Sequence, residues 1–150
     1  MRVLVQRSGN ASVTIDNEVV GKIDSGLVLL VGFTEGDDLS KIEYLAKKVA
    51  NLRIFPDEND VMNKSLLDFG GDILSISQFT LYADAKKGRR PSFVNALRPG
   101  EAEPLYDYFN KQLENKYKPI STGIFGADMM VSSINTGPFT LILDSQELFN

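Results

Sequence analysis

The stretch of sequence that decides the fold is Leu27-Val28-Leu29-Leu30-Val31, which is apolar at every position. A strand with one face in water alternates apolar and polar residues, whereas a strand covered on both faces is apolar throughout. We therefore predict that residues 27–31 form a central strand of a sheet that is covered on both faces.

Strands precede this stretch and a helix follows it. Residues 2–7, 11–15 and 19–23 have the alternation typical of strands, and Asp16-Asn17-Glu18 is a turn signal before the third of them. Beyond the central strand, Gly36-Asp37-Asp38 opens a helix and offers an Asp as its N-cap. The helix is predicted from apolar residues at helical spacing, which are Leu39, Ile42, Leu45, Ala46, Val49 and Leu52.

The remaining chain continues the alternation of strand and helix. Residues 72–82 read as a second buried strand, residues 83–99 as a loop and residues 101–117 as a helix with Pro104 in its first turn. Two more strands are predicted at 129–134 and 139–144. This order indicates an α/β fold, a barrel-like layered sandwich of mixed and antiparallel β-sheets flanked by two main helices. Residues 1–150 are expected to form a single domain.

Composition excludes several kinds of chemistry. The 150 residues include neither histidine nor cysteine, so a Ser-His-Asp or Cys-His relay and a typical zinc site cannot be built. We expect no metal and no cofactor. The net charge of −4 argues against a protein that coats nucleic acid indiscriminately, and no DNA partner is predicted.

The apolar runs are too short for membrane insertion. Only three apolar residues stand between Arg2 and Gln6, and no later stretch reaches the 18 apolar residues that a transmembrane helix requires. We predict a cytoplasmic protein without a membrane partner.

Two segments place polar residues where a buried strand would be apolar, and the first is Ser77-Gln78-Phe79-Thr80. An unsatisfied buried polar group costs about 1–3 kcal/mol, so the hydroxyls and the amide need partners. They could satisfy the backbone of neighbouring loops. Alternatively, they could form the wall of a pocket in which an amide and backbone N–H groups hold a substrate ester.

The second segment is Asn135-Thr136-Gly137-Pro138-Phe139-Thr140. A Gly-Pro pair between two strands is typical of a hairpin turn. A Gly-Pro peptide bond can also be cis, as roughly 5–6% of X-Pro bonds in folded proteins are. A cis bond would point the neighbouring carbonyl groups in the same direction.

Four cations lie close together in the loop predicted after the second buried strand, at Lys86, Lys87, Arg89 and Arg90. They could be no more than the solvated face of a loop. In an acidic protein they could also contact RNA phosphates, which gives affinity and orientation without reading a base sequence.

At these positions the sequence resembles the D-aminoacyl-tRNA deacylases. Residues 77–81 and 135–140 resemble the paired signature motifs of that family, and the likeness extends over essentially the whole chain. Further matching segments are Val5-Gln6-Arg7, Arg53-Ile54-Phe55, residues 87–93 and residues 122–129.

The resemblance implies a homodimer whose active site lies at the subunit interface. Gly137-Pro138, with its peptide bond cis, would project from one subunit into the pocket of the other, and Arg7 would fix its orientation. Ser77, Gln78, Phe79 and Thr80 would line the pocket around the terminal adenosine and the aminoacyl group of tRNA. Phe139 and Thr140 would extend that pocket.

The reaction implied is hydrolysis of the ester bond of D-aminoacyl-tRNA, with glycyl-tRNA as a side substrate. The RNA's 2′-hydroxyl would assist the attacking water, and Gln78 with the N–H groups near Phe79 and Thr80 would stabilise the oxyanion. Thr80 as a nucleophile is the rival mechanism, although it would need a base. Two other activities stay open, namely a non-catalytic tRNA-binding module and a small-molecule esterase that uses Ser or Thr.

Overall fold

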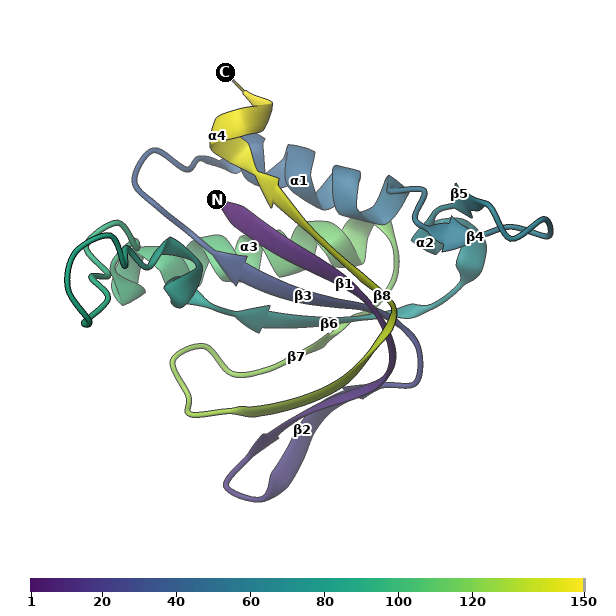
Figure 1. Ribbon diagram of the computed structural model, residues 1–150, viewed down its shortest axis with the longest axis horizontal. Helices are drawn as coiled ribbons and strands as arrows, with labels where there is room; N and C mark the ends of the chain where they lie inside the picture. Colours follow the sequence, from purple (N-terminus) through teal and green to yellow (C-terminus); the bar gives the residue numbers. More distant parts are fainter. Residues whose placement is uncertain (150) are drawn as a thin grey trace.

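The computed structural model describes residues 1–149, which form one curved six-stranded sheet with two long helices packed on one face (Figure 1). A separate two-stranded ribbon projects from one side. In chain order the elements are β1 (Arg2–Ile15), β2 (Glu18–Ile23), β3 (Gly26–Gly32), α1 (Leu39–Asn51), β4 (Phe55–Pro56), β5 (Met62–Lys64), α2 (Leu66–Phe69), β6 (Asp72–Ser77), the 3₁₀ helix η1 (Phe79–Tyr82), α3 (Pro99–Lys116), β7 (Ser121–Thr122), β8 (Met130–Asp144) and α4 (Ser145–Leu148).

The apolar stretch at residues 27–31 lies inside β3, in the middle of the sheet. The strand order is β2-β1-β3-β6-β7, with β8 paired along the other edge of β1. β3 is antiparallel to β1 and parallel to β6. Leu27 and Leu29 enter the core beneath the helices, whereas Val28 enters the core on the opposite face. The predicted central strand, covered on both faces, is therefore confirmed.

The sheet curls until its two ends nearly meet. The Ser121 hydroxyl of β7 donates a 3.0 Å hydrogen bond to the Lys22 carbonyl of β2. Gly21 permits this approach, because a Cβ atom there would lie 2.8 Å from the Thr122 carbonyl oxygen. The structure is thus a nearly closed barrel flanked by two main helices, as predicted.

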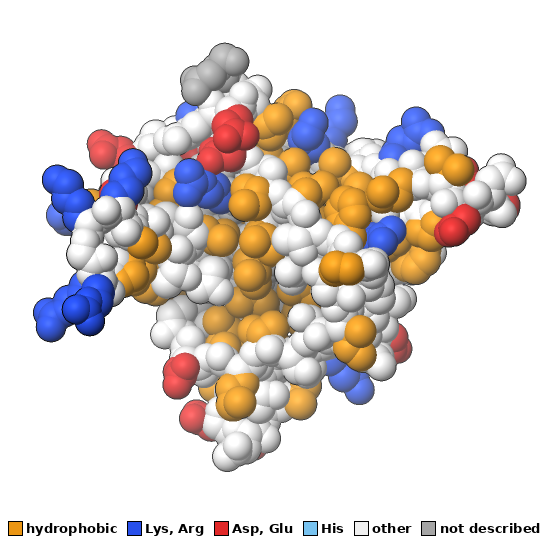
Figure 2. Space-filling view, viewed as in Figure 1, with side chains coloured by type: hydrophobic (Ala, Val, Ile, Leu, Met, Phe, Trp, Pro, Cys, Tyr) orange, Lys and Arg blue, Asp and Glu red, His pale blue; other side chains and the backbone are white. Residues whose placement is uncertain are grey.

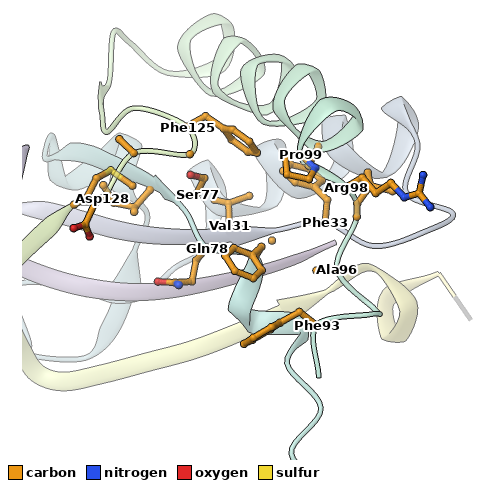
Figure 3. A pocket seen from close by; sticks show the side chains of 18 of the residues that line it. Val31, Phe33, Ser77, Gln78, Phe93, Ala96, Arg98, Pro99, Phe125 and Asp128 are labelled. Atoms are coloured by element: carbon orange, nitrogen blue, oxygen red, sulfur yellow. The ribbon is translucent and has the colours of Figure 1, made fainter. Parts of the chain in front are cut away.

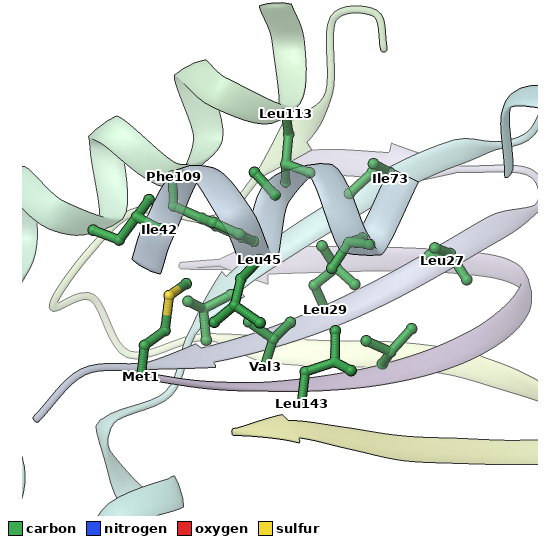
Figure 4. Close-up of a cluster of buried hydrophobic side chains, with 14 of the residues drawn as sticks. Met1, Val3, Leu27, Leu29, Ile42, Leu45, Ile73, Phe109, Leu113 and Leu143 are labelled. Carbon is green, nitrogen blue, oxygen red and sulfur yellow. The ribbon is translucent and has the colours of Figure 1, made fainter. Parts of the chain in front are cut away.

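Each face of the sheet has its own apolar core. The larger core lies between the sheet and helices α1 and α3, where Val3, Leu29, Leu45 and Phe109 interlock (Figure 4). A smaller core fills the inside of the barrel, and its buried members are Ala11, Val13, Ile23, Val28, Leu74 and Ile76. Burial on both faces explains why β3 contains no polar side chain.

The two main helices differ in how well the sequence located them. Helix α1 begins as predicted, with the Asp38 carboxylate accepting the N–H of Lys41 at 2.9 Å. Helix α3 begins two residues earlier than expected, at Pro99, so Pro104 lies in its second turn and not in its first. Proline at the first helical position is favourable because that N–H has no partner in any helix. None of the helices within residues 1–149 is both long and apolar enough to cross a membrane.

Three strand predictions were wrong. The strand predicted over residues 72–82 ends at Ser77, because its neighbour β3 ends at Gly32 and β7 has only two residues. Residues 2–7 and 11–15 belong to the single strand β1. The two predicted C-terminal strands are one strand, β8, which runs along β1 through residues 135–138 without reversing. Gly137-Pro138 is therefore not a hairpin turn.

Candidate functional site

A pocket of about 690 Å³ opens where the parallel strands β3 and β6 end (Figure 3). The ends of the two strands contribute Val31 and Ser77. Phe93 comes from the loop before α3, and Phe125 comes from the loop before β8 (Figure 3). The edge at which parallel strands end is where α/β proteins commonly bind ligands, and an apolar lining with few polar groups is typical of such sites.

The polar wall of this pocket is the segment that links β6 to η1. Ser77, Gln78 and Phe79 line the pocket, whereas Thr80 is exposed beside it. The Gln78 N–H makes the last bond to β3, at 2.7 Å from the Val31 carbonyl oxygen. The chain then turns into η1, which brings the ring of Phe79 to the mouth of the pocket.

Gln78 and Phe79 each hold a neighbour in place. The Gln78 side-chain amide donates a 2.5 Å hydrogen bond to the Thr80 hydroxyl oxygen. The Phe79 ring is half exposed and packs edge-on against the Phe93 ring, with 5.2 Å between the ring centroids. The two rings form an aromatic rim at the pocket mouth.

The start of η1 presents two backbone donors beside Gln78. Within η1 and its flanks, the N–H groups of Leu81 and Ala83 bond to the carbonyl groups of Gln78 and Thr80. No acceptor among residues 1–149 pairs with the N–H of Phe79 or Thr80, as is usual at the start of a helix. Such a pair of N–H donors can stabilise a developing oxyanion.

The ionisable groups of the pocket are few. Arg98 and Asp128 are the charged residues among those that line it, and the Arg98 guanidinium extends away from the cavity in Figure 3. The sequence has no histidine or cysteine to add. Apart from the Asp128 carboxylate, the polar groups of the described lining are mainly hydrogen-bond donors and acceptors, which can position a ligand.

The second signature segment forms a bulge in β8, defined here as residues 136–139. In the register, Gln6 faces Thr140 and Ser8 faces Asn135, so the single residue Arg7 of β1 lies opposite the whole bulge. The bulge residues have no partner in β1. The peptide bond between Gly137 and Pro138 is cis, and both residues are exposed.

Arg7 contacts the bulge through hydrogen bonds and through the Phe139 ring. Its guanidinium donates to the Thr136 carbonyl oxygen at 3.1 and 3.3 Å and to the Ile54 carbonyl oxygen at 2.9 Å. It also lies over the Phe139 ring, 4.9 Å from the ring centroid. A Cβ atom added to Gly137 would come within 2.7 Å of the guanidinium. The guanidinium of Arg7 thus links the bulge both to β1 and to the segment around Ile54.

Asn135 closes the base of the bulge. Its side-chain oxygen accepts the N–H of Phe139 at 2.7 Å, and its amide donates to the Thr140 hydroxyl oxygen at 2.8 Å. Gln6 donates to the same hydroxyl oxygen at 3.3 Å. Phe139 therefore belongs to the bulge, Thr140 is the ladder residue that follows it, and neither lines the pocket of its own chain.

The bulge and the pocket lie far apart within one chain. Arg7 faces Leu27, which faces Ile73, so the bulge is level with the beginning of β6. Ser77 lies four residues further along β6 and three strands away from β8. At about 3.3 Å per residue and 4.8 Å per strand, the separation is roughly 20 Å. The structure does not bring the two predicted halves of the site together within a single chain.

The four predicted RNA-contacting cations occupy one exposed arch next to the pocket. Asp84 and Ser92 exchange two backbone hydrogen bonds of 2.8 Å and so close the base of the arch. Lys86, Lys87, Arg89 and Arg90 are all exposed, and none pairs with a carboxylate within residues 1–149. The arch appears as the blue cluster at the left of Figure 2. It leads directly into Phe93 at the pocket mouth.

Sequence reasoning did not assign the aromatic residues Phe93 and Phe125 to the site. Both lie in loops that are remote from β6 in sequence, and the pocket depends on how helix α3 packs across the sheet. The one sequence feature that could have pointed to them is that both fall within segments resembling the deacylase family, at residues 87–93 and 122–129.

Comparisons with known proteins agree with this architecture. A family model described as D-Tyr-tRNA(Tyr) deacylase matches residues 4–144. The chain is 58% identical over 144 residues to a D-aminoacyl-tRNA deacylase of Lactobacillus gasseri, covering 96% of this chain and 99% of that protein. It is also 58% identical over 145 residues to a D-aminoacyl-tRNA deacylase of Brevibacillus brevis, covering 97% and 100%.

Two solved structures have the same fold. One is named c-Myc DNA Unwinding Element Binding Protein and has a TM-score of 0.91 at 39% identity, covering 96% of this chain and 98% of that one. The other, described as a probable eukaryotic D-amino acid tRNA deacylase, has a TM-score of 0.81 at 17% identity, covering 95% and 97%. The second likeness concerns the fold alone. With the family model and the curated relatives spanning nearly its full length, this chain belongs to the D-aminoacyl-tRNA deacylase family of ester hydrolases.

Proposed function

We propose that this protein hydrolyses the ester bond of D-aminoacyl-tRNA and releases the D-amino acid and free tRNA. The observation that carries this proposal is the pocket wall, where Gln78 and Phe79 line an aromatic cavity and the N–H groups of Phe79 and Thr80 have no acceptor among residues 1–149. Aromatic rings such as Phe93 and Phe125 can stack on the terminal adenine. The N–H groups can stabilise the oxyanion formed when water attacks the ester.

Purified protein incubated with D-tyrosyl-tRNA and with L-tyrosyl-tRNA tests this proposal. We expect release of D-tyrosine and sparing of the L-ester. Binding of either tRNA without release would indicate a non-catalytic tRNA-binding module. Equal turnover of a free D-tyrosine ester that lacks RNA would indicate a small-molecule esterase.

We propose further that the 2′-hydroxyl of the terminal ribose assists the attacking water. The Thr80 hydroxyl oxygen accepts a hydrogen bond from the Gln78 amide, which is a donor and cannot remove a proton. Among residues 1–149 no other side chain hydrogen-bonds to the Thr80 hydroxyl, so the base that a nucleophilic threonine needs is not in place. A substrate with a 2′-deoxy terminal adenosine should react at least about 100-fold more slowly, within the range that a positioned proton-transfer group contributes.

We propose that the working unit is a homodimer in which the bulge of one subunit enters the pocket of the other. The free edge of β8 supports this arrangement, because β8 pairs only with β1 among residues 1–149. β8 also exposes Met130, Val131, Ile134 and Ile142. Apolar side chains gather in the middle of the face that β8 crosses (Figure 2). Exposed apolar patches and unpaired edges favour protein association.

Replacing Ile134 with Glu tests the dimer. Ile134 is 58% exposed, so the change should leave the fold of one chain intact. We expect a monomer by sedimentation equilibrium and loss of D-tyrosyl-tRNA hydrolysis. A fully active monomer would refute the shared site.

We propose that the bulge selects the chirality of the substrate. Residues 136–139 are outside the ladder with β1, so the carbonyl groups of Gly137 and Pro138 are available to engage the substrate's α-ammonium group. A rigid contact at that position crowds one face of the Cα atom, which excludes an L side chain and leaves space for a D side chain. Glycine has no side chain to exclude, so glycyl-tRNA is expected as a side substrate.

We propose that the arch of residues 84–92 contacts the tRNA backbone, and that the protein works in the cytoplasm where aminoacyl-tRNA is found. Its four unpaired cations lie beside the pocket mouth, where an RNA strand would leave the site. Contacts to phosphates supply affinity and orientation without sequence specificity.

A further inference from the structure

A second cavity, of about 650 Å³, lies behind the wall of the first pocket. Three short segments each give one residue to the first pocket and one to the second cavity, in the pairs Phe33 and Thr34, Phe79 and Tyr82, and Ala96 and Asn95. Along η1, residues three apart are separated by about 6 Å. The two hollows are therefore adjacent and share one wall.

The second cavity is lined by polar groups without partners. Asn95, Gln146 and Lys86 are all exposed, and among residues 1–149 their side-chain amide and ammonium groups make no hydrogen bond, so these groups are free to bind a ligand. Each amide offers both a donor and an acceptor, which is the pattern that pairs with the edge of a nucleic-acid base. Lys86 is also the first cation of the arch, so the cavity leads into it.

Arg2 supplies a second cation in a fixed position. Its guanidinium donates to the Asp144 carboxylate at 2.7 Å and to the Leu81 carbonyl oxygen at 2.9 Å, and its Nη2 group has no partner within residues 1–149. It lies over the Tyr82 ring, 4.6 Å from the centroid. An arginine held in this way is suited to bind a phosphate oxygen.

Tyr82 forms part of the wall of the second cavity. The residue is 5% exposed, and its hydroxyl is the one buried side-chain polar atom in residues 1–149 that lacks a hydrogen-bond partner. Because this hydroxyl is closed off from solvent, Tyr82 contributes its ring to the cavity wall and not a hydrogen bond to a ligand.

We infer that the second cavity is a nucleotide subsite for the residue that precedes the terminal adenosine of tRNA, an inference that rests on the proposed function. In the CCA end of tRNA this nucleotide is a cytidine. Its base edge has one amine donor and two acceptors, which the amides of Asn95 and Gln146 complement. Asp84 also lines the cavity and can accept from the cytosine amine, while Arg2 and Lys86 lie where the phosphate would pass.

A base fits this cavity better than an isolated anion does. The Asp84 carboxylate offsets one of the two cations, and Arg2 is already paired with Asp144. The amides of Asn95 and Gln146 add acceptors as well as donors to the lining, which favours a ligand that has both kinds of group. An RNA strand would then run from the pocket through the second cavity to the arch of residues 84–92.

Two ester substrates of different length test the inference. One is D-tyrosyl-adenosine, and the other is the trinucleotide CpCpA carrying D-tyrosine. The variant combines Asn95→Ala with Gln146→Ala, whose side chains make no hydrogen bonds to other groups in residues 1–149. The matched control is Asn115→Ala, an exposed residue at the end of α3.

The quantity measured is the ratio of kcat/KM for the trinucleotide ester to kcat/KM for the adenosine ester. We expect the double variant to lower this ratio by about five- to tenfold, the equivalent of losing one or two hydrogen bonds, and the control to leave it unchanged. An unchanged ratio in the double variant, or equal loss on both substrates, would overturn the subsite. If the parent protein hydrolyses neither ester nor D-tyrosyl-tRNA, the proposed function itself fails.

Binding without catalysis gives a second readout. In NMR spectra, the side-chain amide signals of Asn95 and Gln146 should shift when the dinucleotide CpA is added and should not shift with adenosine alone. Equal shifts with adenosine, or none with CpA at concentrations that move the signals of the first pocket, would contradict the inference.

Discussion

Replacing Arg7 with Lys should weaken chiral discrimination before it weakens hydrolysis. The guanidinium bonds to the carbonyl groups of Thr136 and Ile54 together and covers the Phe139 ring. A lysine ammonium is a single point and can hold only one of the two carbonyl groups. Hydrogen bonds to charged groups contribute about 1.5–3 kcal/mol each, and partial exposure reduces the loss here to about 1 kcal/mol.

That loss predicts two measurable changes. The melting temperature should fall by about 2–4 °C, as expected for a chain of this size. If the free-energy difference by which the bulge favours the D-substrate over the L-substrate falls by a comparable amount, single-turnover discrimination between D- and L-tyrosyl-tRNA should fall roughly five- to tenfold. Arg53→Lys is the matched control, because Arg53 makes a similar bond to the Asn63 carbonyl group away from the bulge. Discrimination in Arg7→Lys equal to that of the parent would refute this role for Arg7.

Three further predictions concern other parts of the molecule. Thr80→Val should retain hydrolysis within a few-fold of the parent, whereas complete loss in a folded protein would favour a threonine nucleophile. Replacing Lys87, Arg89 and Arg90 with Ala should raise KM for aminoacyl-tRNA without changing kcat, and should reduce the slope of log affinity against log salt by roughly two; an unchanged salt slope would exclude the arch from RNA contact. At Asp144, burial raises the pKa, but the hydrogen bonds from Arg2 and the Gln146 N–H outweigh it and leave the pKa below its usual value. A lowered folded-state pKa stabilises the fold above the unfolded-state pKa, so Asp144→Asn should cost about 1 kcal/mol at neutral pH. That difference should close as the pH falls below 3.8 in denaturant titrations, and a pH-independent difference would contradict it.

The parts of the fold that the sequence predicted are those with strong local patterns. The apolar run at residues 27–31 favours a strand covered on both faces, and the apolar spacing after residue 38 is typical of an amphipathic helix. The end of β6 was missed because it depends on the length of its neighbours, β3 and β7. A strand's own residues carry little information about where its partners end.

The residues of the candidate site likewise divide into those that a local sequence pattern predicted and those that it did not. Ser77 and Gln78 stood out because polar residues interrupt a buried strand, and both line the pocket. The geometry of Gly137-Pro138 could not be read from its residues, because a Gly-Pro pair suits a hairpin turn as well as a bulge. Only the long ladder between β1 and β8 distinguishes the two. Phe125 joins the pocket through tertiary packing, which no local pattern encodes.

The most direct test of the shared active site is a mixed-subunit experiment. Gln78→Ala alters the pocket wall and leaves the bulge intact, whereas deletion of Gly137 and Pro138 removes the bulge tip and leaves the wall intact. Each variant alone should be nearly inactive on D-tyrosyl-tRNA. When the two are mixed and allowed to exchange subunits, heterodimers that contain one intact wall facing one intact bulge should recover up to about a quarter of the parent activity, because half of the dimers then carry one working site of two. Failure of the mixture to exceed the two variants measured separately, with subunit exchange confirmed by mass spectrometry, would contradict an active site built from two chains.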